Sequence, residues 1–253
     1  MPFAMPVAES FALQRHFIGT ITPSGNTVVE RITQGIVSTL PLVSAHFSRT
    51  PVFGSTDPSP DAYAVDGLLA AARLLAHAAP QVLVWNGSKG AGIGFAHDLA
   101  LVAAVREATG IAATTSILGM QALCKARGVR RIGVVTPYSD ASQRKTLECL
   151  ANEGFDCVAS ANSGLSDNLS YASVPMPDIA AMVRAVATAK PQAIICLCTN
   201  FPAAVLAAPM EAELGIPLWD STALGVWHAL QLCGARTEEA APRWGSLFTE
   251  ALA

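Results

Sequence analysis

The residues best suited to chemistry stand at the end of one buried apolar segment. Ala193 to Leu197 form a continuous apolar run, typical of a strand buried on both faces, and Cys198-Thr199-Asn200 follow directly. In an open parallel sheet, ligands bind just beyond the carboxyl ends of the strands. Cys198 therefore stands where a nucleophile or proton donor belongs, and backbone N–H groups at a helix start after it could bind an anion. The alternative is that Cys198 is simply a small buried residue, as most free cysteines are.

A second segment has the same plan. In both segments a Pro-Gln pair precedes an apolar strand, and the earlier strand ends at Asn86. Each strand is preceded by a Thr-Pro pair at a similar distance: Thr22 and Asn86 are 64 positions apart, and Thr136 and Cys198 are 62 positions apart. A near-constant offset of this kind is expected of an internal repeat. We therefore predict two similar halves whose strand ends converge on one cleft.

The hydrophobic pattern places these segments in an alternating series of strands and helices. Strands are predicted at residues 17–22, 43–49, 82–85, 131–136, 156–159, 193–197 and 217–220, and residues 113–116 are left unassigned between two helices. Helices are predicted at residues 27–40, 63–78, 96–109, 117–128, 140–153, 177–189, 201–214 and 221–233, with an irregular loop at 51–60 and a polar loop at 160–170. Such alternation implies parallel sheets.

The predicted fold class is therefore α/β, with two pseudosymmetric lobes and the active site in the cleft between them. Each lobe is expected to hold a central, mainly parallel sheet flanked by helices. We place the first lobe at residues 17–118 together with 225–253, because the last helix is expected to return to it. The second lobe is placed at residues 119–224.

Composition narrows the class of protein and of partner. The chain has 253 residues, of which 51% are hydrophobic and 14% charged, as in a compact folded protein. A net charge of −3 without a basic stripe argues against a nucleic-acid partner. No apolar run approaches the length of a membrane span, and the first seventeen residues look like a loose arm, not a signal peptide.

The cysteines and glycines point to no metal or nucleotide. The six cysteines lack metal-ligand spacing, so we interpret them as reduced thiols of a cytoplasmic protein. The glycine-rich stretch at residues 87–94 follows a strand, but no acidic residue closes the next strand at the distance that a dinucleotide site requires. A homo-oligomer is left open.

Four motifs taken together resemble the aspartate/glutamate racemase superfamily, and most of all its branch of maleate cis-trans isomerases and arylmalonate decarboxylases. The motifs are Gly19-x-x-x-Pro-Ser-x-Asn-Thr27, Thr136-Pro-Tyr138, Asp167-Asn168 and Cys198-x-Asn-x-Pro202. The resemblance implies two pseudosymmetric lobes, an active site between them, a small carboxylate substrate, no metal and no organic cofactor. Singly the motifs are weak, but together they occur in the expected order.

The resemblance also implies site residues. Racemases and maleate isomerases of this superfamily use two cysteines, one from each half; Cys198 matches the second, and Asn86 occupies the position of the first. Arylmalonate decarboxylases keep only the second cysteine. The substrate-binding positions implied are Asn26, Asn86, Gly87, Ser88, Tyr138, Asn168, Thr199 and Asn200.

Chemistry next to a carboxylate passes through an enediolate, whose negative charge needs preorganised hydrogen-bond donors. The thiol of Cys198 is suited to exchange a proton with the carbon, and a helix start or donors beside it can lower its pKa from about 8.5. Two thiols permit racemisation or isomerisation, whereas one permits protonation on one face only. Asn86 therefore favours a decarboxylase over an isomerase or racemase. The alternative from another class is a non-catalytic protein that binds small carboxylates.

Overall fold

The computed structural model describes residues 15–52 and 61–252. Most of the expected N-terminal arm, and all but the first two residues of the loop expected at 51–60, lie outside the described residues. Within them, strands and helices alternate along the chain, as the hydrophobic pattern predicts.

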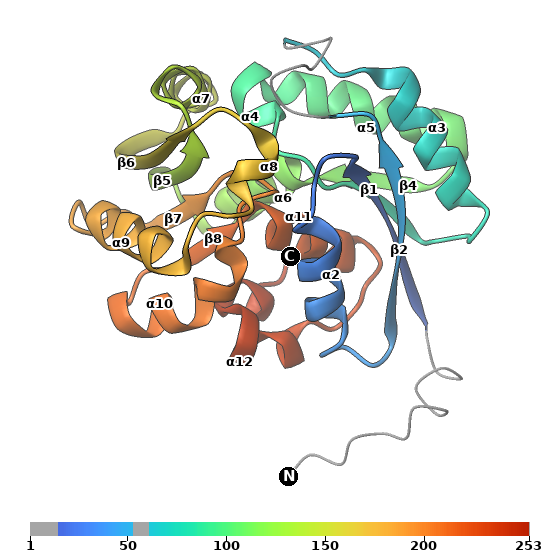
Figure 1. Cartoon of the computed structure of the whole chain (residues 1–253). Helices are drawn as coiled ribbons and strands as arrows, with labels where there is room; N and C mark the ends of the chain where they lie inside the picture. The colour runs from blue at the N-terminus through green and yellow to red at the C-terminus, as the bar shows by residue number, and fades with distance from the viewer. Residues whose placement is uncertain (1–14, 53–60, 253) are drawn as a thin grey trace.

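Two four-stranded parallel sheets form the framework (Figure 1). The first contains β1 (His16–Pro23), β2 (Val43–Thr50), β3 (Val82–Trp85) and β4 (Ala112–Thr115), and the second contains β5 (Arg131–Tyr138), β6 (Asp156–Leu165), β7 (Ala193–Cys196) and β8 (Leu218–Asp220). Their strand orders are β2-β1-β3-β4 and β6-β5-β7-β8. The same order recurs in each sheet, so the predicted class of two similar α/β halves is confirmed. Residues 15–127 are called the first half below, and residues 131–220 the second half.

Helices flank both sheets (Figure 1). In the first half these are α2 (Val29–Val37), α3 (Val65–Ala76), α4 (Gly90–Ile93), α5 (Phe95–Thr109) and α6 (Ser116–Arg127). The second half has α7 (Asp140–Asn152), α8 (Asn168–Tyr171), α9 (Met176–Ala187), the 3₁₀ turn η2 (Ala203–Leu206) and α10 (Ala207–Leu214), and it is followed by α11 (Ser221–Leu232), η3 (Glu238–Ala240), α12 (Ala241–Trp244) and η4 (Ser246–Thr249).

The repeated Pro-Gln pairs have the same structural role in both halves. The side-chain oxygen of Gln81 accepts a hydrogen bond from the backbone N–H of Phe17 at 2.6 Å. The side-chain oxygen of Gln192 accepts from the backbone N–H groups of Arg130 and Arg131 at 2.8 and 2.9 Å. Each glutamine thus ties the start of one central strand, β3 or β7, to the start of its neighbour. The sequence repeat therefore corresponds to a repeat of hydrogen bonds.

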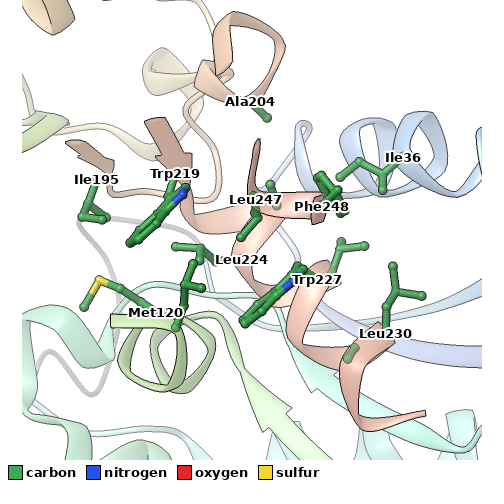
Figure 2. Close-up of a cluster of buried hydrophobic side chains, with 14 of the residues drawn as sticks. Ile36, Met120, Ile195, Ala204, Trp219, Leu224, Trp227, Leu230, Leu247 and Phe248 are labelled. Atoms are coloured by element: carbon green, nitrogen blue, oxygen red, sulfur yellow. The ribbon is translucent and has the colours of Figure 1, made fainter. Parts of the chain in front are cut away.

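One apolar core runs through both halves. Its largest cluster joins side chains of the first sheet to side chains of the second. Figure 2 shows its central part, where Met120 of α6, Ile195 of β7, Trp219 of β8 and Trp227 of α11 lie together. Helix α11 packs against α6 and α2 of the first half, while α12 contacts α10 of the second. The predicted lobe boundaries stay a prediction.

Several element boundaries differ from those expected from the sequence, and two of the differences lie in the second half. Residues 160–165, which were expected to form part of a polar loop, continue strand β6. This strand lies at the edge of its sheet, pairs only with β5 and is half-exposed, so polar side chains are tolerated there. The segment after Cys198 is a turn, closed by the Phe201 N–H bonded to the Cys198 carbonyl at 3.0 Å, and the first helical turn begins only at Ala203. Pro202, which has no N–H to donate, lies between the turn and the helix.

Candidate active site

The carboxyl ends of the central strands open into one cavity of about 430 Å³ that is lined by both halves. Of the predicted site residues, its lining includes Asn26, Gly87, Ser88, Tyr138, Asn168, Cys198 and Thr199. A second cavity of about 450 Å³ lies beside β6 and α9 and contains none of the predicted residues among its described lining. The structure therefore brings seven of the nine predicted residues to one place, and the remaining two, Asn86 and Asn200, lie behind its wall.

Cys198 is held in a strained backbone conformation at the end of β7. The Leu197 N–H donates to the Val135 carbonyl at 2.9 Å, which fixes the strand end. Cys198 itself has φ 118°, in the region that favours glycine, and its residue is only 5% exposed. Backbone strain of this kind costs about 1–3 kcal/mol and is found mainly at functional sites. The observed conformation therefore supports a role for this thiol beyond packing.

The environment of Cys198 favours the protonated thiol. Burial raises its pKa to about 12, while the Asn200 backbone N–H and the Tyr138 hydroxyl act to lower it, and the carboxyl group of Asp220 acts to raise it. The donors do not outweigh desolvation, because the helix whose start was expected to lower the pKa begins only at Ala203. At neutral pH the Cys198 thiol is therefore protonated, a state that suits a proton donor better than a thiolate nucleophile.

Two hydroxyl groups from opposite halves meet beside the thiol. The Ser88 Oγ and Tyr138 Oη atoms are 3.2 Å apart. Burial holds the pKa of Tyr138 well above its usual range, so its hydroxyl stays protonated and can donate. Tyr171 of α8 packs edge-on against Tyr138, with ring centroids 5.6 Å apart, and also lines the cavity. Tyr171 was not predicted as a site residue, although it is three residues after Asn168 and therefore on the same face of a helical turn.

Asn26 combines a helix cap with a contact across the cleft. Its side-chain oxygen accepts hydrogen bonds from the N–H groups of Val28 and Val29, both at 2.8 Å, and so satisfies the start of α2. Its amide nitrogen donates to the Thr199 hydroxyl at 3.2 Å. The cap thus holds an amide donor and a hydroxyl side by side at the cavity wall.

Asn168 and Asn200 fasten the loops of the two halves to each other. The Asn168 amide donates to the Gly25 carbonyl at 3.1 Å, and the Asn200 amide donates to the Asn168 carbonyl at 2.6 Å. The Asn200 side-chain oxygen accepts from the Thr27 N–H at 2.8 Å. The side chain of Asn200 is therefore used for structure, and only its backbone N–H is directed at the thiol.

Asn86 is turned away from the cavity, in contrast to the expectation that it faces the substrate. It is fully buried; its amide donates to the Thr222 carbonyl at 3.2 Å, and its oxygen accepts from the Ser116 hydroxyl at 2.8 Å. The Thr222 hydroxyl in turn donates to the Thr199 carbonyl at 3.2 Å. Among the described lining residues, Cys198 is thus the one thiol at the cavity.

An apolar wall, not foreseen from the sequence, forms one side of the cavity. Its side chains are Val52, Tyr63, Leu68, Trp85 and Ile93. The Tyr63 ring meets Trp85 edge-on at 6.1 Å, and the Tyr63 hydroxyl donates to the buried carboxylate of Asp98 at 3.2 Å. A Cβ on Gly87 would lie 2.5 Å from the Trp85 indole, so that position requires glycine. The cavity therefore offers hydrogen-bond donors near the thiol and an apolar surface beside them.

The described residues show neither a metal-binding cluster nor a membrane-spanning helix. Within residues 15–52 and 61–252, no group of three or more His, Cys, Asp or Glu side chains is placed to hold a metal ion. In the same ranges, no helix has the length and apolar character needed to cross a bilayer.

Known proteins of two kinds are similar to this chain. Residues 55–248 match the family model described as arylmalonate decarboxylase. The arylmalonate decarboxylase of Bordetella bronchiseptica is 29% identical over 159 residues, a match that spans 62% of this chain and 66%, just under two thirds, of that protein. Among solved structures, unliganded arylmalonate decarboxylase has 26% identity and a TM-score of 0.74, covering 94% of this chain and all of its own.

A maleate cis-trans isomerase from Nocardia farcinica, solved bound to TRIS, has the same fold, with a TM-score of 0.83, 22% identity and coverage of 92% of this chain and 98% of its own. At this identity the likeness concerns the fold alone. The family model, in contrast, matches most of the chain and both segments that end in the cavity. The chain therefore belongs to the arylmalonate decarboxylase family, within the aspartate/glutamate racemase superfamily.

Proposed function

We propose that this chain is a cofactor-independent decarboxylase of 2-substituted malonates, in which Cys198 protonates the carbon that loses carbon dioxide. The observation that carries the proposal is a single protonated thiol at the cavity, with Asn86 withdrawn at the position of the first cysteine. Family membership supports the same reaction.

The proposed reaction has two steps. The bond between the α-carbon and one carboxylate breaks, carbon dioxide leaves, and the electron pair stays on the remaining fragment as an enediolate. Cys198 then gives its proton to the α-carbon, a C–H bond forms, and the thiolate is reprotonated from solvent. A high thiol pKa suits this role, because the sulfur must hold a proton before the reaction and recover one after it.

The enediolate would be held by donors already in place. The hydroxyls of Ser88, Tyr138 and Thr199 line the cavity beside the thiol, and the Asn26 amide lies next to the last of them. These groups are anchored by hydrogen bonds before any ligand binds, and preorganised donors of this kind are worth roughly 100- to 1000-fold in rate each.

The alternative function, maleate isomerisation or racemisation, is favoured less by the site. Covalent addition needs a thiolate, whereas burial keeps Cys198 protonated. The cavity, at about 430 Å³, is also of the size that takes a ligand with a bulky substituent. An aryl group on the malonate would pack against the apolar wall.

The test uses the purified protein with 2-methyl-2-phenylmalonate and, separately, with maleate. We expect release of carbon dioxide, loss of this activity in Cys198→Ser, and a 2-phenylpropionate product that is largely one enantiomer, because the proton arrives from one side. Conversion of maleate to fumarate without decarboxylation would assign the chain to the isomerases. Tight binding of malonates without turnover of either compound would make it a binding protein.

We also infer a cytoplasmic location, because all six cysteines are free and disulfides are rare in the cytosol. The partner is proposed to be a small carboxylate substrate. Association into a homo-oligomer stays a prediction, which light scattering of the purified protein would check.

A further inference from the structure

The cavity has a second polar end, formed by a helix that carries none of the residues discussed above. Ser142, Lys145 and Thr146 of α7 line it. Residues at positions i, i+3 and i+4 lie on one face of a helix, so α7 presents one continuous polar face to the cavity. Helix α7 belongs to the second half and contacts α4 of the first half, and Figure 1 shows the two helices close together.

Positive charge gathers at this end. Lys145 forms an ion pair and hydrogen bond with the carboxylate of Asp61, and the Lys89 ammonium donates to the Ala62 carbonyl at 2.6 Å. Both ammonium groups therefore reach the same short segment, which directly precedes Tyr63 of the apolar wall. The pKa of Asp61 is lowered by its hydrogen bond to Lys145 first, and the charge of Lys89 acts in the same direction.

The apolar wall belongs to the same cavity as both polar surfaces. Trp85, Tyr63 and Ile93 line it together with Cys198 and Lys145. A ligand that meets all three surfaces carries carboxylates, an apolar body and a further anionic group.

We propose that the natural substrate is a malonate whose aryl-type substituent bears a second anionic group, and that Lys145 binds that group. This rests on the proposed function, because the malonate end is taken from it. The ion pair with Asp61 does not prevent such binding: the Lys145 side chain is 54% exposed and that of Asp61 76% exposed. An exposed pair of this kind contributes little, and an ammonium group has three donors to share.

The test compares substrates that differ only at the far end. These are 2-phenylmalonate, the 3- and 4-carboxyphenyl malonates, and the corresponding carbamoylphenyl malonates, which have nearly the same size but no charge. We expect the wild-type KM to be about three- to tenfold lower for one carboxylated malonate than for its carbamoyl partner, with similar kcat. This preference should shrink as salt is added, because screening weakens a partly exposed pair.

Variants test whether Lys145 recognises substrate or only stabilises the structure through its ion pair with Asp61, a role called the structural latch below. Lys145→Met should abolish the preference for the carboxylated malonate, and Lys145→Arg should retain it. Asp61→Asn should increase it, because the competing carboxylate is gone. Lys125→Met, at an exposed lysine of α6 outside the cavity lining, is the matched control and should change nothing. A latch would instead make Lys145→Met and Asp61→Asn alter all substrates alike and in the same direction.

Binding to the Cys198→Ala protein, measured by calorimetry with the same compounds, keeps the two proposals apart. Two results would overturn this inference and leave the proposed decarboxylase unaffected. One is turnover of phenylmalonates with no preference for a carboxylated compound. The other is that Lys145→Met and Asp61→Asn change the kinetics of every substrate equally. Selective binding of a carboxylated malonate without turnover in the wild-type protein would overturn the decarboxylase and support the subsite.

Discussion

At the scale of single residues, Cys198 combines a strained backbone with a buried, protonated thiol. A residue with a Cβ is sterically strained at φ 118°, whereas glycine, which has no Cβ, is not. The strain persists because hydrogen bonds on both sides of the residue, at Leu197 and Phe201, hold the turn. The position of the sulfur is thus set by the backbone around it.

This strain leads to a test on stability and activity together. Cys198→Ala and Cys198→Gly should both lose nearly all decarboxylation while remaining folded. Cys198→Gly should be more stable than Cys198→Ala by about 1 kcal/mol, because glycine removes the Cβ from a backbone conformation that favours glycine. Urea unfolding of both variants measures the difference. The usual ranking, with alanine more stable than glycine, would show that the backbone at Cys198 is not strained.

Tyr138 is the second residue whose removal discriminates between roles. Tyr138→Phe keeps the ring but deletes the hydroxyl that meets Ser88 and donates to the thiol. We expect kcat to fall about 100-fold with little change in KM, as for loss of a donor to the enediolate. A rise in KM alone, measured in the same assay, would show that Tyr138 only binds the ground state.

At the scale of elements, the junction between β8 and α11 places a buried carboxyl next to β7, the strand that precedes Cys198. Asp220 pairs with Cys196 across the β7–β8 ladder and is 1% exposed. Its Oδ1 atom accepts from the N–H groups of Thr222 and Ala223, which caps α11, whereas Oδ2 is buried with no hydrogen-bond partner in the part of the chain that the structure describes. Ionising this group is therefore costly.

The cost makes stability depend on pH. Burial raises the pKa of Asp220 from 3.8 to about 7, so the folded protein holds this proton more tightly than the unfolded chain does. Its stabilising contribution is complete below about pH 4 and is lost as the pH rises through 7. Asp220→Asn keeps a capping side chain without the charge. Urea unfolding at pH 5.5 and 8.5 should show a smaller loss of stability between these pH values in the variant, by about 1–3 kcal/mol; an equal loss in both proteins would contradict the assignment.

At the scale of the whole molecule, the two halves share one core and one set of loop contacts. The largest apolar cluster contains Ile18 and Ile132, which stand at equivalent places in the first strands of the two sheets. Asn26, Asn168 and Asn200 add polar contacts between the halves at the cavity, to Thr199, Gly25 and Thr27 respectively. A shared core of this kind couples the stability of the halves.

We therefore expect the halves to unfold as one unit. Trp227→Ala, which opens a cavity in the shared cluster, should cost about 3–5 kcal/mol and lower the hydrogen-exchange protection of β3 and β7 by the same amount. An exposed change such as Leu74→Ala in α3 is the control and should affect neither. Loss of protection in one sheet only would show that the halves unfold separately.

The sequence by itself determined the alternation of strands and helices, the two-fold repeat and the place of the thiol, although it did not identify β4 as a strand. Short apolar runs such as residues 82–85 and 193–196 report burial on both faces directly, and constant offsets between them report the repeat. The same local signals place Cys198 at a strand end, where a parallel sheet presents ligand-binding groups. Each of these features depends on neighbours in the chain.

Only the tertiary structure decided how the site residues are used. Asn86 turns away because its amide bonds to Thr222, which is 136 positions further along the chain. The pKa of Cys198 rises because distant elements bury it, against the effect of its local donors. The apolar wall and the lysine end of the cavity are likewise assembled from β3, α3, α4 and α7 and from the segments after β2 and before α3. Burial and long-range hydrogen bonds join residues far apart in sequence, so no local pattern encodes them.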